Sequence, residues 1–469
     1  METFKLNIIE ASDSYKYSHA KQYPPDTQFV YSNFMARTPV PWGDEDEIMV
    51  SGIRQIIKNW LSGPVVTQES IDKMDAICKK HFGNDKIFNR KGWEYILNNY
   101  KGYLPLRIKT VPEGTVMGSR NVIMTVENTD PNCWWLTNFV ESLLVQAWYP
   151  ITVGSLSRQI KKLISRYLEE TGTPEDVVVK LHDFGVRGAS SMESAAIGGA
   201  AHLVNFIGTD NIPALRLLDY MYGEECAGVS IPAAEHSTIT SWGKDNEVEA
   251  FRNMLEQFPD GLVAVVSDSY DLFNACENLW GDELKSQVLS RENGFLVVRP
   301  DSGNPSEVVL KTLEILGDKF GYSVNEKGFK VLDPHVRVIQ GDGINYNSIE
   351  AILSTIKSAG WSADNIAFGM GGALLQQSNR DTLGFAFKAS SIVRDGERFD
   401  FKKEPKTDMA KASLQGRLKL IRVEGSHGTA ITTVPEEAEG DDLMQIVLEN
   451  GVMFNGSDNL DDVRKRASI

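Results

Sequence analysis

Cysteine is scarce in this chain, and its few copies lie far apart. The 469 residues include four cysteines, at Cys78, Cys133, Cys226 and Cys276. No two of them form a C-x-x-C pair, and none stands beside paired histidines. The sequence therefore predicts neither a disulfide framework nor a zinc site, and we expect buried free thiols.

Excess positive charge and long apolar runs are also lacking. The formal net charge is −16, which argues against binding to nucleic acid or to an anionic membrane, because both need clustered Lys and Arg. The first residues lack the basic region and the long apolar region that are typical of a signal sequence, and no apolar run approaches the roughly 20 residues that span a bilayer. We expect a soluble, cytoplasmic protein with a small-molecule partner.

The N-terminal part of the chain, residues 1–170, mixes two kinds of pattern. Apolar residues recur at helical spacing between 48 and 100, whereas 104–111 and 121–126 alternate like antiparallel strands. Residues 134–170 predict two amphipathic helices separated near Pro150. This region is typical of an α+β domain.

From about residue 171 to 393, short apolar strands alternate with helical stretches, as in βα units. The predicted strands are 177–181, 229–231, 262–266, 295–298, 336–339 and 366–368, with a seventh at 385–393. Asn304 and Pro305 mark the start of one helix between them. The alternation predicts an α/β fold whose parallel sheet closes into an irregular (β/α) barrel resembling a TIM barrel. A doubly wound open sheet is the alternative, since strand count alone does not show closure.

Residues 394–469 lose this alternation. A hairpin is predicted across 416–433. We expect this segment to pack on the N-terminal region and to form with it an additional α+β, antiparallel domain.

One predicted strand, at 229–231, leads into Glu235 and His236, where a helix begins with Ser237 or Thr238 as its N-cap. Taken alone, His236 is most simply an ordinary hydrogen-bonded histidine. The other strand ends carry a similar set of side chains, however. The ionisable residues at these ends are Asp183, Glu235, His236, Asp268, Arg299, Asp301 and Asp342. Because the carboxyl ends of parallel strands meet at one edge, the joint pattern predicts an active site there.

Several of these residues also have a structural explanation. Asp268 is equally well placed to cap the following helix, and Asp342, flanked by glycines, suits a tight turn. Arg299 and Asp301 can pair with each other. The functional interpretation depends on the whole set.

The last predicted strand ends in the glycine-rich segment 369–373, where backbone N–H groups can face a phosphate. Arg380 and Lys388 follow and can supply countercharge. Carboxylates beside a phosphate site suggest Mg²⁺, which prefers oxygen ligands. The residues by themselves therefore predict a barrel that handles a phosphorylated, hydroxylated substrate with magnesium.

The motifs as a set resemble the nicotinamide phosphoribosyltransferase family. They are Asp13-Ser-Tyr-Lys16, Lys180-Leu-His-Asp-Phe-Gly185, Gly208-Thr-Asp210, Pro232-Ala-Ala-Glu-His-Ser237, Ser267-Asp-Ser-Tyr-Asp271, Arg299-Pro-Asp-Ser-Gly-Asn-Pro305 and Gln340-Gly-Asp-Gly343. They occur in family order over nearly the whole chain. Val186 in place of an aromatic residue, and Met370 and Ala373 in the glycine-rich loop, depart from the family pattern.

The resemblance implies transfer of a phosphoribosyl group from 5-phosphoribosyl 1-pyrophosphate to nicotinamide, giving nicotinamide mononucleotide and pyrophosphate. It implies that Phe184 stacks on the pyridine ring and that Tyr15 covers the other face from the partner subunit of a homodimer with shared active sites. Asp210 would accept a hydrogen bond from the carboxamide and repel the carboxylate of nicotinate.

The remaining site residues follow from the same resemblance. Arg187 and Arg299 match neighbours of the amide and ribose, and Asp301, Asp342 and Gly341 match ribose or magnesium contacts, with Asp268 and Asp301 as metal ligands. Gly371, Gly372 and Arg380 match the phosphate site. Arg37, Lys388 and Lys403 match groups that bind pyrophosphate or nucleotide phosphates, with Lys402 as the alternative to Lys403.

His236 matches the family histidine that ATP phosphorylates, so the resemblance implies ATP as a coupling co-substrate beside Mg²⁺. A carboxylate, Glu235 or Asp268, would fix the tautomer of the imidazole. We expect Asp268, because consecutive residues of a regular strand point to opposite sides.

Three other functions are weighed against this one. Nicotinate phosphoribosyltransferase shares the fold and the donor, and Asp210 speaks against it. A Schiff-base aldolase needs a desolvated lysine at a strand end, for which Lys180 is the candidate. A non-catalytic nucleotide-binding protein would have no need for His236 together with Asp268, Arg299 and Asp301.

Overall fold

The computed structural model describes residues 5–406, 412–425, 428–454, 456 and 458–468. The chain forms two compact units. One contains residues up to 155 together with 379–468, and the other contains residues 156–378. We call them the antiparallel unit and the parallel unit, after their main sheets. None of the helices in the described ranges combines the length and the apolar character needed to cross a membrane.

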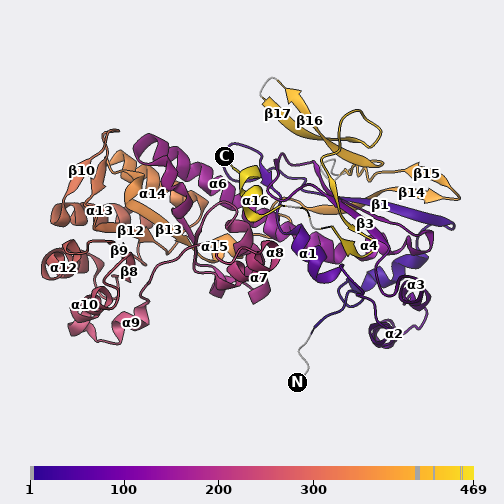
Figure 1. Ribbon diagram of the computed structural model, residues 1–469, viewed down its shortest axis with the longest axis horizontal. Helices are drawn as coiled ribbons and strands as arrows, with labels where there is room; N and C mark the ends of the chain where they lie inside the picture. The colour runs from indigo at the N-terminus through magenta and orange to yellow at the C-terminus, as the bar shows by residue number, and fades with distance from the viewer. Residues whose placement is uncertain (1–4, 407–411, 426–427, 455, 457, 469) are drawn as a thin grey trace. The chain divides into compact units, whose positions relative to one another are not determined.

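The antiparallel unit is built on a seven-stranded sheet in the order β15-β14-β1-β5-β3-β18-β19 (Figure 1). Its strands are β1 (Thr27–Met35), β2 (Ile48–Met49), β3 (Leu106–Thr110), β4 (Val116–Met117), β5 (Val122–Asn128), β14 (Ala386–Arg394), β15 (Glu397–Asp400), β16 (Leu418–Gly425), β17 (Gly428–Pro435), β18 (Gln445–Glu449) and β19 (Val452–Met453). Its helices are η1 (Ser14–Lys21), α1 (Ile53–Trp60), α2 (Gln68–Phe82), α3 (Arg90–Tyr100), η2 (Pro131–Cys133), α4 (Leu136–Phe139), α5 (Glu141–Leu144), η3 (Val145–Ala147) and α16 (Leu460–Arg466).

Alternation along β3 shows why this sheet forms. Leu106, Ile108 and Thr110 are buried, whereas the residues between them are half-exposed. The core on the buried side includes Trp93, Phe139 and Phe385. The same core includes Leu420 and Leu448, so residues from both ends of the chain share it.

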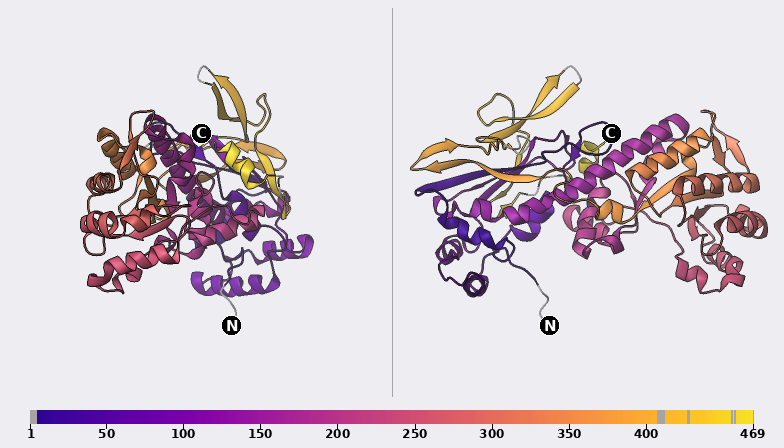
Figure 2. Two further views of the ribbon diagram at one scale, coloured as in Figure 1. Left: turned by 60° about the vertical axis from the view of Figure 1, so that its left-hand side comes forward. Right: turned by 180° about the vertical axis from the view of Figure 1, so that it is seen from behind.

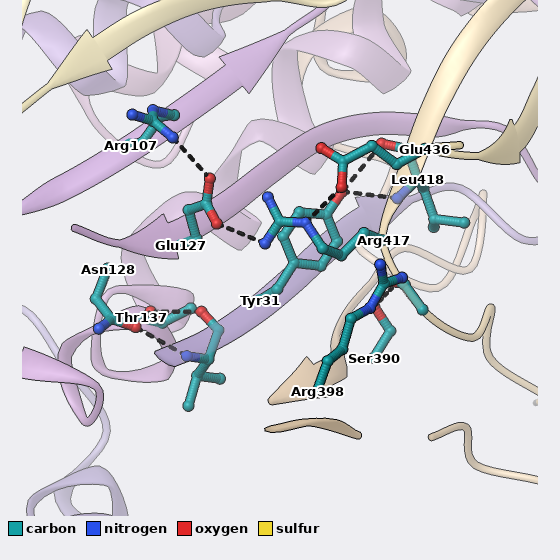
Figure 3. A network of polar contacts seen from close by, with 12 residues as sticks. Tyr31, Arg107, Glu127, Asn128, Thr137, Ser390, Arg398, Arg417, Leu418 and Glu436 are labelled. Atoms are coloured by element: carbon teal, nitrogen blue, oxygen red, sulfur yellow. Dashed lines mark hydrogen bonds and ion pairs between the residues drawn. The ribbon is translucent and has the colours of Figure 1, made fainter. Parts of the chain in front are cut away.

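The C-terminal hairpin is tied to the sheet by a polar network (Figure 3). Its two strands, β16 and β17, pair in register from Leu418 opposite Pro435. The guanidinium of Arg417 pairs with Glu127 of β5 at 2.7 Å and with Glu436 at 2.6 Å. Arg417 also lies 4.6 Å from the ring centroid of Tyr31. Figure 2 shows the hairpin extending from the rest of this unit.

One strand predicted for this part of the sequence is wrongly assigned. The strand predicted at 385–393 is not part of the parallel sheet: it is β14, which pairs antiparallel with β1 from Thr27 opposite Arg394 to Met35 opposite Ala386. An apolar run of this length fits either sheet, and only the register with β1 decides. The helix boundary predicted near Pro150 lies between Ala147 and Trp148: α6 (Trp148–Thr171) begins there, with Pro150 in its first turn, where proline is tolerated, and the region before it forms three short helices instead of one.

The parallel unit is built on the sheet β7-β6-β13-β12-β9-β8, in which every pairing is parallel. Its strands are β6 (Leu181–Asp183), β7 (Gly208–Thr209), β8 (Val263–Val266), β9 (Leu296–Arg299), β12 (Val336–Gln340) and β13 (Ile366–Met370), with a separate hairpin of β10 (Tyr322–Val324) and β11 (Lys330–Leu332). The edge strands are joined through residues 229–233: Gly208 forms a parallel bridge with Val229, and Ala233 forms one with Ala264. The sheet is therefore curled rather than flat.

Helices alternate with these strands. They are η4 (Pro174–Val179), η5 (Val186–Gly188), α7 (Met192–His202), α8 (Ile212–Tyr222), α9 (His236–Thr240), η6 (Lys244–Asn246), α10 (Glu247–Gln257), α11 (Leu272–Asn274), η7 (Ala275–Glu283, a π-helix), α12 (Lys285–Leu289), α13 (Pro305–Phe320), α14 (Tyr346–Ser358), η8 (Ala363–Asn365) and α15 (Gly372–Leu375). Asn304 caps α13 as predicted, accepting from the backbone N–H of Ser306 at 3.2 Å. Helices α13 and α14 pack on each other beside β12 (Figure 1).

Two predicted strands of this unit were misplaced. Most of 177–181 is the helix η4, and the strand β6 begins only at Leu181, because Pro174 and the acidic residues after it start a helical turn. Residues 229–231 form an isolated bridge and no regular strand. The short apolar run at 229–231 is compatible with a strand or with an irregular segment. The segment pairs with each neighbouring strand through one residue only, Val229 with Gly208 and Ala233 with Ala264.

Candidate active site

The predicted site residues of the parallel unit follow the carboxyl ends of its strands. Phe184 follows β6, Asp210 follows β7, and Asp268 comes two residues after β8. Asp301 comes two residues after β9, and Asp342 two residues after β12. Because all these strands are parallel, the residues gather at one edge of the sheet.

His236 and Asp268 are in direct contact. The Nε2 atom of His236 lies 3.0 Å from Oδ1 of Asp268. The other oxygen of Asp268 accepts the backbone N–H of Asp301 at 3.2 Å and the hydroxyl of Ser302 at 2.5 Å. The Asp268 side chain is 5% exposed and that of His236 is 46% exposed, so a buried carboxylate holds an imidazole that stays open to ligand. The hydrogen bond expected between these two residues is present.

Asp301 stands on the other side of the same imidazole. Its Oδ2 atom lies 3.8 Å from Nδ1 of His236. Partial burial raises the pKa of Asp301, although Arg299 nearby opposes the shift. The charges of Asp268 and Asp342 shift the pKa of Asp301 in the same direction as burial.

Glu235 lies at the start of the next helix. It is the N-cap of α9, and its backbone N–H donates to the hydroxyl of Thr238 at 3.2 Å. Its carboxylate accepts the hydroxyl of Ser237. The helix therefore starts at His236, earlier than predicted, because Glu235 is the last residue with extended backbone angles. Ser237 and Thr238, the predicted N-caps, are hydrogen-bonded to Glu235, which is the N-cap.

The ring of Phe184 lies against two glycines. A Cβ atom at Gly369 would be 2.0 Å from the Cε2 atom of Phe184, and one at Gly341 would be 3.7 Å from it. The same Cβ at Gly341 would be 3.6 Å from Oδ1 of Asp301. Any side chain at position 369 would push the aromatic ring out of place, so this glycine shapes the floor of an apolar slot.

Several buried polar atoms at the same strand ends have no hydrogen-bond partner among the described residues. They include Nε of Arg299, the last residue of β9, and Oε1 of Gln340, the last residue of β12. A buried guanidinium N–H without an acceptor is costly, so Nε of Arg299 is suited to bond to an acceptor on a bound ligand.

The other predicted residues of this unit lie at the rim. Arg187, Asp210 and Asp342 are exposed. The hydroxyl of Ser230 donates to Oδ1 of Asp210 at 2.5 Å. Gly371 and Gly372 begin the four-residue helix α15, and a Cβ at Gly372 would meet no other atom within 4 Å, so its backbone borders open space.

The predicted residues of the antiparallel unit form a second group. All five line one cavity of about 300 Å³: Tyr15, Arg37, Arg380, Lys388 and Lys403. Lys402 is not part of its wall and pairs with Glu404 at 2.7 Å, so the structure favours Lys403. Burial, together with the charges of Arg37 and Lys403, lowers the pKa of Lys388. A cavity with four cations is suited to a polyphosphate.

Tyr15 is held in that wall by its neighbours in sequence. Lys16, which is buried, forms an ion pair with Glu141 at the start of α5. Asp13 accepts the hydroxyl of Ser142 at 2.5 Å. Tyr15 itself is 55% exposed, so its ring is free to contact a ligand or another chain.

The residues fit a magnesium ion in part. No group of three or more His, Cys, Asp or Glu side chains suited to a metal occurs within the described ranges. Asp268 already uses both oxygens for hydrogen bonds, whereas the half-buried carboxylate of Asp301 is more open. Mg²⁺ is commonly held by one or two carboxylates plus phosphate oxygens, which matches this donor set.

Lys180, the lysine needed for an aldolase, lies at the wrong end of its strand. It immediately precedes β6 and donates to the backbone oxygen of Asp364, just before β13, at 2.9 Å. Burial lowers the pKa of Lys180 to about 8. The amine is therefore satisfied at the amino ends of the strands, away from the predicted site.

Comparison with known proteins places these features in a family. The Nicotinate phosphoribosyltransferase (NAPRTase) family matches residues 179–437, just over half of the chain. The Nicotinamide phosphoribosyltransferase N-terminal domain matches residues 7–108. The chain belongs to the nicotinate phosphoribosyltransferase family. It is by membership a phosphoribosyltransferase, and the two matches together include Tyr15, Phe184 and His236.

Curated relatives of this phosphoribosyltransferase match almost end to end. A nicotinamide phosphoribosyltransferase of Xanthomonas campestris pv. campestris is 46% identical over 96% of this chain and 95% of its own length. One of Acinetobacter baylyi is 33% identical over 99% of this chain and 97% of its own length.

Solved structures show the fold. A nicotinate-nucleotide pyrophosphorylase from Pyrococcus furiosus has a TM-score of 0.61 at 14% identity, covering 100% of this chain and 97% of its own. The human nicotinic acid phosphoribosyltransferase has a TM-score of 0.58 at 14% identity, covering 97% and 92%. The mixed α/β fold with its curled parallel sheet is therefore shared with this group.

Three contacts at the site were not predicted from the sequence. Ser302 and Ser230 each donate to a predicted acid, and Glu141 pairs with Lys16. Ser302 and Ser230 stand within three residues of a strand end or bridge, which was the available signal. Glu141 lies in a helical pattern that gave none.

Proposed function

We propose that this enzyme transfers the phosphoribosyl group of 5-phosphoribosyl 1-pyrophosphate to the ring nitrogen of nicotinamide. The products are nicotinamide mononucleotide and pyrophosphate, as in NAD salvage. The relatives at 46% and 33% identity are named nicotinamide phosphoribosyltransferase. The observation that carries the proposal is that Phe184, with its apolar slot, and the carboxylate of Asp210 directly follow the adjacent parallel strands β6 and β7.

The slot and the acid divide the work of recognition. The Phe184 ring, held over Gly369, offers a flat apolar face to the pyridine. Asp210 accepts the N–H of a carboxamide and repels a carboxylate, which selects nicotinamide over nicotinate. The unpaired Nε of Arg299 is available to the substrate's oxygen atoms.

In the transition state, carboxylates stabilise the positive charge on the ribose and cations stabilise the negative charge on the pyrophosphate. The ribose ring becomes oxocarbenium-like as the pyrophosphate leaves, so a carboxylate near the ribose stabilises it. We assign that role to Asp301 and Asp342, which follow the ends of β9 and β12. Arg37, Lys388 and Lys403 hold the departing pyrophosphate, and Arg380 with Gly371 and Gly372 hold the 5-phosphate. Bound Mg²⁺, with Asp301 and Asp268 as ligands, would neutralise pyrophosphate charge.

We further propose that ATP phosphorylates His236 and that hydrolysis of the phosphohistidine drives synthesis. An ionised carboxylate only accepts hydrogen bonds, so Nε2 of His236 carries the hydrogen that Asp268 receives. The lone pair of the neutral ring is then on Nδ1, the atom facing Asp301. Asp268 in this way prepares Nδ1 as the nucleophile.

We infer that two copies of the chain form a homodimer with shared active sites. Tyr15 and the phosphate-binding cations belong to the antiparallel unit, and Phe184 and His236 belong to the parallel unit. In the dimer, Tyr15 of one subunit covers the pyridine bound to Phe184 of the other. We also infer that the bridges through residues 229–233 close the parallel sheet into an irregular (β/α) barrel.

The test is product formation from 5-phosphoribosyl 1-pyrophosphate and magnesium, with nicotinamide and nicotinate in separate reactions, with and without ATP. We expect nicotinamide mononucleotide in preference to the acid product, and a higher yield with ATP. Preference for nicotinate would replace the proposed substrate by that of a nicotinate phosphoribosyltransferase. Ligand binding without product from either base would indicate a non-catalytic protein.

A further inference from the structure

Ser230 stands beside the acid that the proposed function assigns to amide recognition. Its hydroxyl donates to Oδ1 of Asp210 at 2.5 Å, a short and therefore strong charge-assisted hydrogen bond. The Oδ2 atom of Asp210 accepts no hydrogen bond from the described part of the chain. One oxygen is thus fixed by the protein and the other is left open.

The backbone brings these two side chains together independently of their own contact. Asp210 is anchored by its N–H, which donates to the backbone oxygen of Asp183 at 3.0 Å. Val229 precedes Ser230, and its backbone oxygen accepts the N–H of Thr209 at 2.9 Å. Two neighbouring parallel segments therefore end side by side, with the hydroxyl on one and the carboxylate on the other.

The hydroxyl of Ser230 matters because the groups around Asp210 do not neutralise its negative charge. The charge of Asp210 acts on the imidazole of His182, but burial is the larger effect and lowers the pKa of His182, so this ring supplies no full positive charge at pH 7. Asp183, on the preceding strand, is an acid that supplies no positive charge. In the described structure Asp210 has no ion pair, and a neutral hydroxyl is its hydrogen-bonding partner.

We propose that Ser230 is a positioning residue that determines substrate specificity through Asp210. The hydroxyl fixes the carboxylate with its free oxygen available to the carboxamide N–H, yet it cancels none of the negative charge that repels nicotinate. A lysine or arginine in its place would orient Asp210 equally well but would remove that repulsion. The inference rests on the proposed function, since it needs nicotinamide to be the substrate.

The first experiment compares Ser230→Ala and Ser230→Thr with the unchanged enzyme. Hydrogen bonds to charged groups contribute roughly 1.5–3 kcal/mol, so we expect the alanine variant to raise the KM for nicotinamide about tenfold or more, with kcat changed less than about twofold. The threonine variant keeps the hydroxyl and should restore most of the affinity. Ser358→Ala, an exposed serine of α14 that bonds to its own helix, is the matched control and should change neither constant.

A second experiment separates an effect through Asp210 from a general structural role. In an Asp210→Ala background, Ser230→Ala should change kcat/KM for nicotinamide by less than about twofold, because its partner is already absent. Additive losses, or an unchanged KM in the single variant, would overturn the inference. Thermal unfolding of each variant verifies that the proteins are folded.

The outcomes for the inference and for the proposed function are distinct. An unchanged enzyme that forms no nicotinamide mononucleotide, or that prefers nicotinate, removes the proposed function and the inference together. An unchanged enzyme that forms it while Ser230→Ala behaves identically removes the inference alone. Ser230→Lys adds a positive test: use of nicotinate should increase relative to nicotinamide, and an unaltered ratio would count against the role of uncompensated charge.

Discussion

At the scale of single residues, the contact between His236 and Asp268 is the most informative feature. The two residues are 32 positions apart, and their side chains meet because the bridge at Ala233 aligns the segment before α9 with β8. The carboxylate is held by three donors, so it is fixed before any ligand arrives. This arrangement is typical of a residue that orients an imidazole.

Replacing Asp268 by Asn tests that orientation. The variant cannot hold Nε2 with an ionised acceptor, so we expect phosphohistidine formation from ATP to be slowed about 10- to 100-fold. The measurement is incorporation of the labelled γ-phosphate into protein. Asp245→Asn removes an exposed carboxylate from the same unit and should leave the rate unchanged. Normal phosphorylation in Asp268→Asn would disprove the assignment.

Asp183 predicts a pH dependence of stability. Burial raises its pKa to about 6, although Asn211 and the backbone N–H of Gly185 donate to it. The unfolded chain releases this proton near the ordinary pKa of about 3.8, so between about pH 4 and 6 the folded state binds more protons. The contribution of Asp183 to the free energy of unfolding should therefore fall as pH rises through this window.

The size of that effect is up to about 3 kcal/mol, the equivalent of roughly two pKa units. Urea unfolding of the unchanged protein and of Asp183→Asn, measured from pH 4 to 7, isolates it as a difference in slope. The unchanged protein should lose stability relative to the variant as pH rises. Parallel curves would show that Asp183 titrates normally.

At the scale of elements, the end of β8 is supported from behind by the π-helix η7. Trp280 of η7 is fully buried, stacks on Phe251 of α10 at 4.4 Å, and donates its indole N–H to the hydroxyl of Ser267 at 3.1 Å. Ser267 immediately precedes Asp268. The packing of two helices thus fixes the strand end that carries the acid.

Trp280→Phe removes the indole donor and part of the packed volume. We expect the free energy of unfolding to fall by about 1–3 kcal/mol, measured by urea unfolding. Trp242, which is 41% exposed, provides the matched control, and Trp242→Phe should stay within about 0.5 kcal/mol of the unchanged protein. Equal effects in the two variants would argue against a specific role for the Trp280 hydrogen bond.

At the scale of the whole molecule, the predicted site residues are divided between two units. The cations of the phosphate cavity lie in the antiparallel unit, and the pyridine slot and His236 lie in the parallel unit. The proposed homodimer unites them across subunits. That arrangement makes activity depend on two chains rather than one.

Mixing two inactive variants tests this dependence. Arg37→Ala damages the phosphate cavity and Phe184→Ala damages the slot, so in a mixed dimer one site carries both defects and the other carries none. Co-expression in equal amounts should restore about a quarter of the wild-type activity. A mixture of Arg37→Ala with Lys388→Ala, two changes in one unit, should stay inactive. Absence of restoration in the first mixture would exclude shared sites.

The sequence by itself determined the residue types of the site, the alternation of strands and helices, and the family, because motifs and periodicity are local properties. It also predicted the cap of α13 at Asn304 and the C-terminal hairpin, which depend on neighbouring residues. Local signals were insufficient where the same residues suit either a strand or a helical turn, as in η4 just before β6.

Only the tertiary structure decided which segments pair. Position 386–394 became a strand of the antiparallel sheet because its register matches β1, more than 350 residues away in the chain. The choice of Lys403 over Lys402, and the hydroxyls of Ser302 and Ser230 on their acids, likewise depend on contacts between distant segments. Such contacts are set by packing and hydrogen bonding between elements, and no local pattern of residues encodes them.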